Sequence, residues 1–165
     1  MDLIHVAIVE DEPLFVQQLK EYIGRYEKDR GRRIKITTFA DGEDITDDYR
    51  GGYDIILMDI QMRFMDGMTA AEKIRTLDHE VIIMFITNMI QYAVRGYEVD
   101  AMDYVVKPVE YFAFSQKLDK AIGRMKKAVQ TYISVPTEDG LQKLAVSDIY
   151  YIESQGHNAC YRTAR

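Results

Sequence analysis

The chain has 165 residues, which is room for one domain of ordinary size and a short remainder. A hydrophobic content of 47% with 29% charged residues is typical of a soluble globular protein, and the net charge of −6 argues against direct nucleic-acid binding by the acidic first 125 residues. The single cysteine, Cys160, cannot form an internal disulfide, the apolar runs are too short to cross a membrane, and the N-terminus lacks a signal segment. We therefore expect a cytoplasmic protein with no membrane partner.

Five apolar, partly β-branched runs alternate with five segments of helical periodicity over the first 130 residues. The predicted strands are Ile4–Val9, Ile34–Phe39, Asp54–Met58, Val81–Ile86 and Met102–Val106. The predicted helices are Pro13–Asp29, Glu43–Tyr49, Met68–Leu77, Ile90–Arg95, which is expected to end at Gly96, and Glu110–Gln130. This alternation indicates an α/β fold, a doubly wound parallel sheet.

The pattern changes after Gln130, where short strand-like runs and turn glycines replace the alternation. The predicted strands there are Tyr132–Val135, Leu141–Val146, Ile149–Ile152 and Ala159–Thr163. We assign residues 1–128 to the α/β domain and residues 129–165 to a second, all-β unit. Because a unit of about 35 residues buries too little apolar surface to be stable alone, we expect it to be an incomplete, truncated domain.

Acidic residues follow two of the predicted strands. Glu10 and Asp11 follow the first strand, and Asp59 follows the third. The carboxyl ends of parallel strands meet at one edge of an open sheet, where such sheets bind ligands. Carboxylates that meet there repel one another unless a cation neutralises them or one keeps a proton. The three acids predict a site for Mg²⁺ or Mn²⁺, in which Asp11 and Asp59 are ligands and Glu10 holds a bound water.

Two other polar residues lie at the same predicted edge. Thr87 follows the fourth strand, and Lys107, followed by Pro108, comes after the fifth. A metal site alone has no use for a hydroxyl donor and a cation facing the carboxylates, whereas a phosphoryl group would be held by both. Asp59 is then the nucleophile that accepts the phosphoryl group. Thr87 on its own is also a common helix cap, and we interpret Glu12 as a capping acid of the first helix.

These positions carry a resemblance to the receiver domain of bacterial two-component response regulators, over about residues 4–125. The matching residues are Glu10-Asp11, Leu57-Met58-Asp59-Ile60-Gln61-Met62, Met65-Asp66-Gly67, Thr87, Tyr104 and Lys107-Pro108. The resemblance implies a flavodoxin-like (βα)5 fold with strand order 2-1-3-4-5, and a sensor histidine kinase that phosphorylates Asp59. It also implies a metal bound by the Gln61 backbone carbonyl, a cis peptide before Pro108, and a switch formed by Thr87 and Tyr104.

One segment departs from that family's pattern. Many relatives carry Pro-Gly where this chain has Arg63-Phe64. Neither residue is a predicted site ligand, so we expect phosphorylation to persist. The change affects the rigidity of the loop and its contact with the kinase, and Phe64 is a candidate exposed anchor for a partner.

Two segments resemble regulators that join a receiver to a LytTR-type DNA-binding domain. They are Tyr92–Tyr104 and, in the tail, Gly140-Leu141 followed by Val146–Ser154. The resemblance implies a transcription regulator that forms a homodimer on phosphorylation through the fourth helix, the fifth strand and the fifth helix. Because the tail holds only the opening strands of such a domain, we expect DNA binding only through a complete effector domain.

Two other classes of function are open from the sequence. The chain could be a receiver module that acts only through protein–protein contacts, without DNA binding. It could also be a phosphatase or phosphotransferase, but haloacid dehalogenase-like enzymes carry two aspartates one residue apart after the first strand. The corresponding stretch is Glu10-Asp11-Glu12-Pro13. We therefore predict a phosphoacceptor signalling protein, capable at most of self-dephosphorylation, and not an enzyme.

Overall fold

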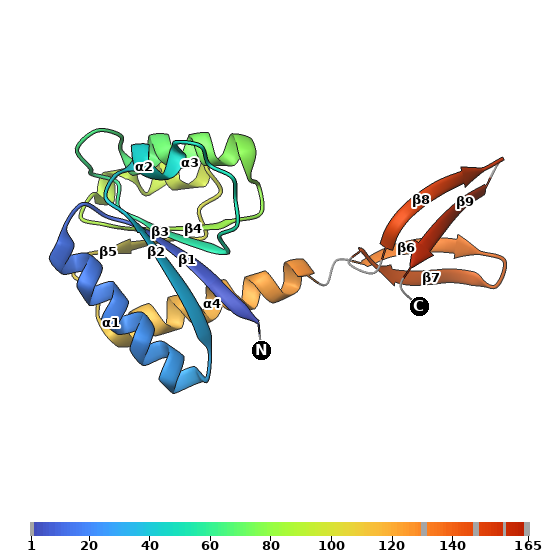
Figure 1. The fold of residues 1–165 in the computed structure, drawn as a ribbon, viewed down its shortest axis with the longest axis horizontal. Helices are drawn as coiled ribbons and strands as arrows, with labels where there is room; N and C mark the ends of the chain where they lie inside the picture. The colour runs from blue at the N-terminus through green and yellow to red at the C-terminus, as the bar shows by residue number, and fades with distance from the viewer. Residues whose placement is uncertain (1, 130–131, 147–148, 157, 164–165) are drawn as a thin grey trace. The chain divides into compact units, whose positions relative to one another are not determined.

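A computed structural model describes residues 2–129, 132–146, 149–156 and 158–163, and the chain divides into two compact units, residues 1–121 and 122–165 (Figure 1). Helices and strands alternate up to α4, which begins in the first unit and ends in the second. They are β1 (Leu3–Val9), α1 (Pro13–Arg30), β2 (Arg33–Phe39), α2 (Gly42–Thr46), β3 (Ile55–Met58), α3 (Gly67–Leu77), β4 (Ile82–Thr87), the 3₁₀ segments η1 (Ile90–Tyr92) and η2 (Val94–Tyr97), β5 (Asp103–Val106) and α4 (Tyr111–Val129). Among the described helices, none is both long and apolar enough to cross a bilayer.

The five strands of the first unit form one parallel sheet in the order β2-β1-β3-β4-β5. The helices α2 and α3 lie on one face of this sheet, and α1 and the first part of α4 lie on the other (Figure 1). The central strands β3 and β4 are buried at every position, as expected for strands covered on both faces. The predicted doubly wound α/β fold and its strand order are confirmed.

The core holds the strands in fixed positions from both sides. On one face, alternate side chains of β1, β3 and β4 pack with α3 in a cluster that includes Val9, Met58 and Phe85. On the other face, the Tyr22 hydroxyl of α1 donates to the Val109 carbonyl at 2.8 Å, just before α4. The strand ends at the carboxyl edge therefore project from a sheet whose central strands β3 and β4 are covered on both faces.

The predicted fourth helix over Ile90–Arg95 is wrong in type and in its end. The segment forms two 3₁₀ turns, and Gly96 lies inside η2 instead of ending a helix. Its backbone bonds have 3₁₀ spacing, with the Tyr92 N–H donating to the Met89 carbonyl and the Gly96 N–H to the Ala93 carbonyl, both at 3.2 Å. A short segment with an internal glycine is a poor nucleus for an α-helix, which explains the tighter turns.

The second unit contains two antiparallel strand pairs. β6 (Tyr132–Thr137) pairs with β7 (Gly140–Ala145), and β8 (Ile149–Gln155) pairs with β9 (Asn158–Thr163). All four strands predicted in the tail are present, with slightly different bounds. Each two-stranded sheet is small, and large apolar side chains such as Leu141 and Ile152 are exposed.

Candidate functional site

The predicted site residues meet at the carboxyl edge of the sheet. The Asp59 N–H donates to the Val9 carbonyl at 3.0 Å, which sets Asp59 beside the end of β1 and next to Glu10. The Lys107 N–H donates to the Thr87 carbonyl at 3.0 Å, which sets Lys107 beside the end of β4. The parallel ladders thus bring together residues that are far apart in the sequence, as strand-end position predicted.

Three carboxylates are crowded at this edge. Glu10 is 3% exposed and Asp59 is 7% exposed, whereas Asp11 is exposed. One oxygen from each of the three lies within 4.8 Å of the others. Backbone amides supply hydrogen bonds to two of these carboxylates. The Glu12 N–H donates to Glu10 Oε1 at 3.0 Å, and the Ile60 N–H donates to Asp59 Oδ1 at 2.7 Å.

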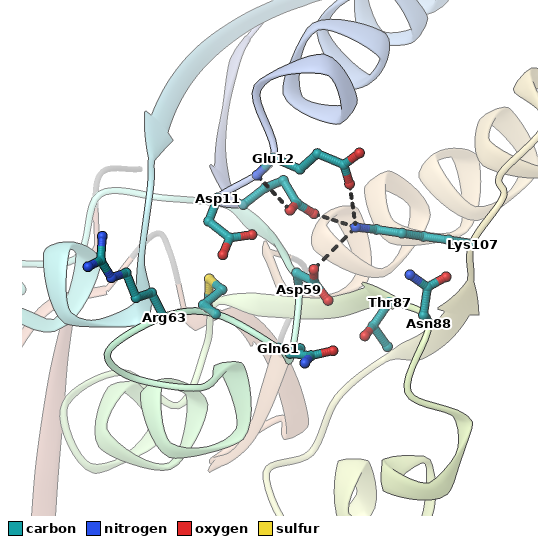
Figure 2. A pocket seen from close by; sticks show the side chains of 10 residues that line it. Asp11, Glu12, Asp59, Gln61, Arg63, Thr87, Asn88 and Lys107 are labelled. Atoms are coloured by element: carbon teal, nitrogen blue, oxygen red, sulfur yellow. Dashed lines mark hydrogen bonds and ion pairs between the residues drawn. The ribbon is translucent and has the colours of Figure 1, made fainter.

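Lys107 supplies a positive charge to this cluster. Its Nζ lies 2.8 Å from Glu10 Oε2, 3.2 Å from Asp59 Oδ2 and 3.9 Å from Glu12 Oε2. Figure 2 shows the lysine side chain reaching toward these carboxylates from the opposite side of the pocket. The ammonium also lies 4.2 Å from the centre of the Phe15 ring, within range of a cation–π interaction.

The cluster keeps an excess of negative charge. Burial raises the pKa of Glu10 to about 7, and the Asp59 charge adds to this, although the hydrogen bond from Lys107 opposes it. Burial alone would lower the pKa of Lys107, but the Glu10 and Asp59 carboxylates outweigh it and hold that pKa above its ordinary value. One ammonium therefore faces three carboxylates. The carboxylates exceed the nearby positive charge by one or two units, and a cluster of oxygen ligands with that excess fits a hard divalent cation.

Thr87 and Tyr104 lie on the adjacent strands. Thr87 is fully buried, and its Oγ1 accepts a hydrogen bond from the Met89 N–H at 3.2 Å, so the hydroxyl proton is left for another acceptor. The Tyr104 ring lies 6.3 Å from the Phe85 ring, and its hydroxyl is buried without a hydrogen-bond partner in the described part of the chain. The tyrosine hydroxyl is thus already inside the protein in this structure.

The site opens into a cavity of about 370 Å³. The cavity is lined by the predicted residues Glu10, Asp11, Asp59, Gln61, Thr87 and Lys107, and also by Glu12, Met62, Arg63 and Asn88 (Figure 2). Tyr104 does not line it. The peptide between Lys107 and Pro108 is cis, as the family resemblance implied.

Two residues near Lys107 have contacts that the sequence did not predict. Glu12 is the N-cap residue of α1, as predicted, but its side chain makes no capping hydrogen bond and instead lies 3.9 Å from Lys107 Nζ. Phe15 lies in the first helix, and its helical spacing does not indicate that its ring contacts the Lys107 ammonium. The proximity of α1 to the end of β5 creates both contacts, and no local pattern encodes it.

Comparison with known proteins places these features in a family. The family model of the response regulator receiver domain matches residues 6–119. The sensory transduction protein LytT of Enterococcus faecalis is 27% identical over 163 residues, covering 90% of this chain and 64% of LytT. The transcriptional regulatory protein YpdB of Escherichia coli K12 is 30% identical over 162 residues, covering 90% of this chain and 65% of YpdB.

Solved structures give the same result. The response regulatory domain of mrkE from Klebsiella pneumoniae superposes with a TM-score of 0.68 at 30% identity, covering 75% of this chain and 99% of that domain. The response regulator TrrA from Thermotoga maritima, solved in complex with Mg²⁺ and BeF, has a TM-score of 0.62 at 26% identity, covering 72% of this chain and 98% of TrrA. The chain spans slightly less than two thirds of the length of LytT and YpdB. Because the family match covers residues 6–119, which hold most of the sheet and all the residues of the site, this chain belongs to the response regulator receiver domain family.

Proposed function

We propose that Asp59 accepts a phosphoryl group from a phosphohistidine of a sensor histidine kinase. A carboxylate oxygen of Asp59 would form the new O–P bond while the P–N bond breaks, and the imidazole would leave with that electron pair. The observation that carries this proposal is the 3.2 Å contact between Lys107 Nζ and Asp59 Oδ2 at the wall of the cavity. Lys107 is thereby near enough to pair with an oxygen of the incoming phosphoryl group.

The carboxylates of Glu10, Asp11 and Asp59 and the backbone carbonyl of Gln61 are the groups that would hold a divalent metal, Mg²⁺ or Mn²⁺. The charge excess in the cluster and the Mg²⁺ bound in the TrrA structure favour magnesium. When bound, the metal would supply the positive charge that offsets repulsion between these carboxylates and the phosphoryl oxygens.

Thr87 would transmit the phosphorylation state. Its hydroxyl proton is available to a phosphoryl oxygen, and movement of Thr87 toward that oxygen would lengthen its 3.2 Å bond to the Met89 N–H. The η1 segment begins directly after Met89, so this movement would change the surface formed by η1, η2 and β5. Tyr104 would contribute through its buried hydroxyl, because a shift of Thr87 would change the groups that lie next to this hydroxyl.

The output of this change would be transcription control through a LytTR-type effector domain. LytT and YpdB are named as sensory transduction and transcriptional regulatory proteins, which favours this output over a receiver that acts only through protein contacts. We propose that phosphorylation promotes a homodimer through η1, η2, β5 and α4, and that DNA is bound only through a complete effector domain.

Phosphorylation with a small acyl phosphate and Mg²⁺ tests the assignment of Asp59. The parent should incorporate one phosphoryl group per chain, as measured by mass spectrometry of the intact protein, and Asp59→Asn should incorporate none. Asp66→Asn is a suitable control because this acid caps α3 outside the cavity lining. Incorporation by Asp59→Asn equal to that of the parent would sink the proposal.

Substrate turnover separates this function from a phosphatase. A phosphoacceptor should release inorganic phosphate only at the rate at which its own acyl phosphate hydrolyses, and small phosphoesters should not be consumed in many turnovers. Release of many equivalents of phosphate from a phosphomonoester, abolished in Asp59→Asn, would show an enzyme instead.

A further inference from the structure

A third buried acid, Asp41, lies outside the cavity at the candidate site and binds the loop that follows Asp59. Asp41 is 5% exposed and is the N-cap of α2. Its Oδ1 accepts hydrogen bonds from the N–H groups of Glu43 and Met65, both at 2.9 Å, and its Oδ2 accepts one from the Phe64 N–H at 2.9 Å. A single carboxylate therefore joins the start of α2 to the loop between β3 and α3.

This loop has few other attachments near the cavity. At its ends, the Gly67 N–H donates to the Ile60 carbonyl at 2.8 Å, and a Cβ at Gly67 would lie 2.1 Å from the Asp59 carbonyl oxygen, so the ends are tightly closed. Between them, Gln61 and Met62 line the cavity but make no hydrogen bond with any residue that the structure describes. The next anchor along the chain is the pair of amides that Asp41 holds.

Two other observations show that this contact is closely built. A Cβ at Gly42 would lie only 2.7 Å from the Met65 carbonyl oxygen, so the start of α2 touches the loop backbone directly. Burial would raise the pKa of Asp41, but the N–H groups of Glu43, Phe64, Met65 and Arg63 outweigh it and hold that pKa below its ordinary value.

We propose that Asp41 is a positioning residue for the metal and phosphoryl site. By fixing residues 64 and 65, it holds the segment 61–63 against the cavity and keeps the Gln61 backbone carbonyl in place for the metal. This inference rests on the proposed function, because it assumes that the cavity binds a divalent metal.

The simpler interpretation is that Asp41 only caps α2, and a serine at this position separates the two roles. Asp41→Ser keeps a short oxygen acceptor for the Glu43 N–H but cannot reach both loop amides. Asp66→Ser is the matched control, since Asp66 caps α3 at 2.8 Å to the Thr69 N–H and is exposed. Only a role in positioning the loop makes the two serine variants differ in metal affinity.

The test measures the Mg²⁺ dissociation constant of the full chain by isothermal titration calorimetry, together with hydrogen exchange of the Phe64 and Met65 amides. We expect Asp41→Ser to weaken Mg²⁺ binding about tenfold and to speed exchange of both amides, because loss of a supporting contact behind a metal ligand has effects of about this size. Asp66→Ser should remain within about twofold of the parent.

The outcomes separate the two levels of the proposal. If the parent binds no Mg²⁺, the proposed function fails. If the parent binds Mg²⁺ and Asp41→Ser binds it equally well, Asp41 is only a cap and this inference is overturned. Should Asp41→Ser not fold, Asp41→Asn serves instead, because its amide group cannot accept from Phe64 while its oxygen can still accept from Met65. It should then weaken Mg²⁺ binding about threefold, and parent-like affinity would again overturn the inference.

Discussion

Replacing Lys107 by methionine tests the charge balance on which the candidate site depends. Met is of similar length but uncharged, so Glu10 and Asp59 would lose the cation that lies 2.8 and 3.2 Å from them. Removing one partner of a buried ion pair costs on the order of 3–5 kcal/mol. Because Glu10 can take up a proton, we expect the lower end, a loss of about 3 kcal/mol in the free energy of unfolding in metal-free neutral buffer.

Urea unfolding followed by circular dichroism, with EDTA or with Mg²⁺, measures this loss. A metal that binds only the folded state stabilises it by about 2.7 kcal/mol at one hundred times its dissociation constant. Mg²⁺ should therefore bring Lys107→Met back to about the stability that the parent has in EDTA. Acid should also restore stability. The pKa of Glu10 is raised to about 7, so the folded state binds the proton more tightly than the unfolded state, and stability rises as the pH falls through 7 toward the ordinary value of 4.5.

Lys117→Met is the control for this experiment. Lys117 pairs with Asp103 at 2.6 Å, but its side chain is 37% exposed, so its removal should cost less than about 1 kcal/mol. Its effect should not depend on Mg²⁺, because neither residue lines the cavity. Parent-like stability of Lys107→Met in EDTA, or a loss that Mg²⁺ does not reverse, would refute the proposed charge balance.

Three other changes test individual contacts. Phe15→Leu removes the ring 4.2 Å from the Lys107 ammonium and should slow phosphorylation by an acyl phosphate about fivefold, while Phe15→Tyr should preserve the rate, as phosphoprotein accumulation over time would show. Tyr104→Phe removes a buried hydroxyl without a hydrogen-bond partner, so the free energy of unfolding should stay the same or rise by up to about 1 kcal/mol. A clear drop in the melting temperature of this variant would show that the hydroxyl does make a hydrogen bond. Arg75→Lys loses the guanidinium group that donates to the Val99 carbonyl at 2.7 Å and to three other backbone carbonyls. Urea titrations should show a free energy of unfolding lower by about 2 kcal/mol, and stability equal to that of the parent would contradict this role of Arg75.

The sequence predicted the sheet and the gathering of the site residues because both depend on simple periodicities. A buried strand reads as an apolar run, and the residue after each run must lie at the carboxyl edge once the strands are parallel. Asp59 and Lys107 were therefore found from local patterns, although 48 residues separate them. The same reasoning failed for the segment after Thr87, because helical periodicity does not show that a short segment with an internal glycine forms 3₁₀ turns instead of an α-helix.

The contacts that the sequence did not reveal are those between side chains and distant backbone. The short polar motif Asp41-Gly42 is typical of a turn, and the position of Asp41 as the N-cap of α2 agrees with it. Nothing in that motif indicates that the same carboxylate also binds the amides of Phe64 and Met65, 23 and 24 residues further along. Such contacts arise only when two loops at the sheet edge meet, and propensities describe single segments.

The buried acids Asp41 and Glu10 differ in how far the protein compensates their negative charge. Asp41 is satisfied by amides from two segments, and its pKa is held below the ordinary value, so its negative charge is already compensated within the protein. Glu10 is equally buried, and burial together with the Asp59 charge raises its pKa to about 7 against the opposing hydrogen bond from Lys107, which Asp59 shares. A structural acid cluster would gain stability from further donors. Because the fold leaves this shortage of positive charge at the cavity, whereas the charge of Asp41 is already compensated, the shortage is best explained by a cation that arrives from solution.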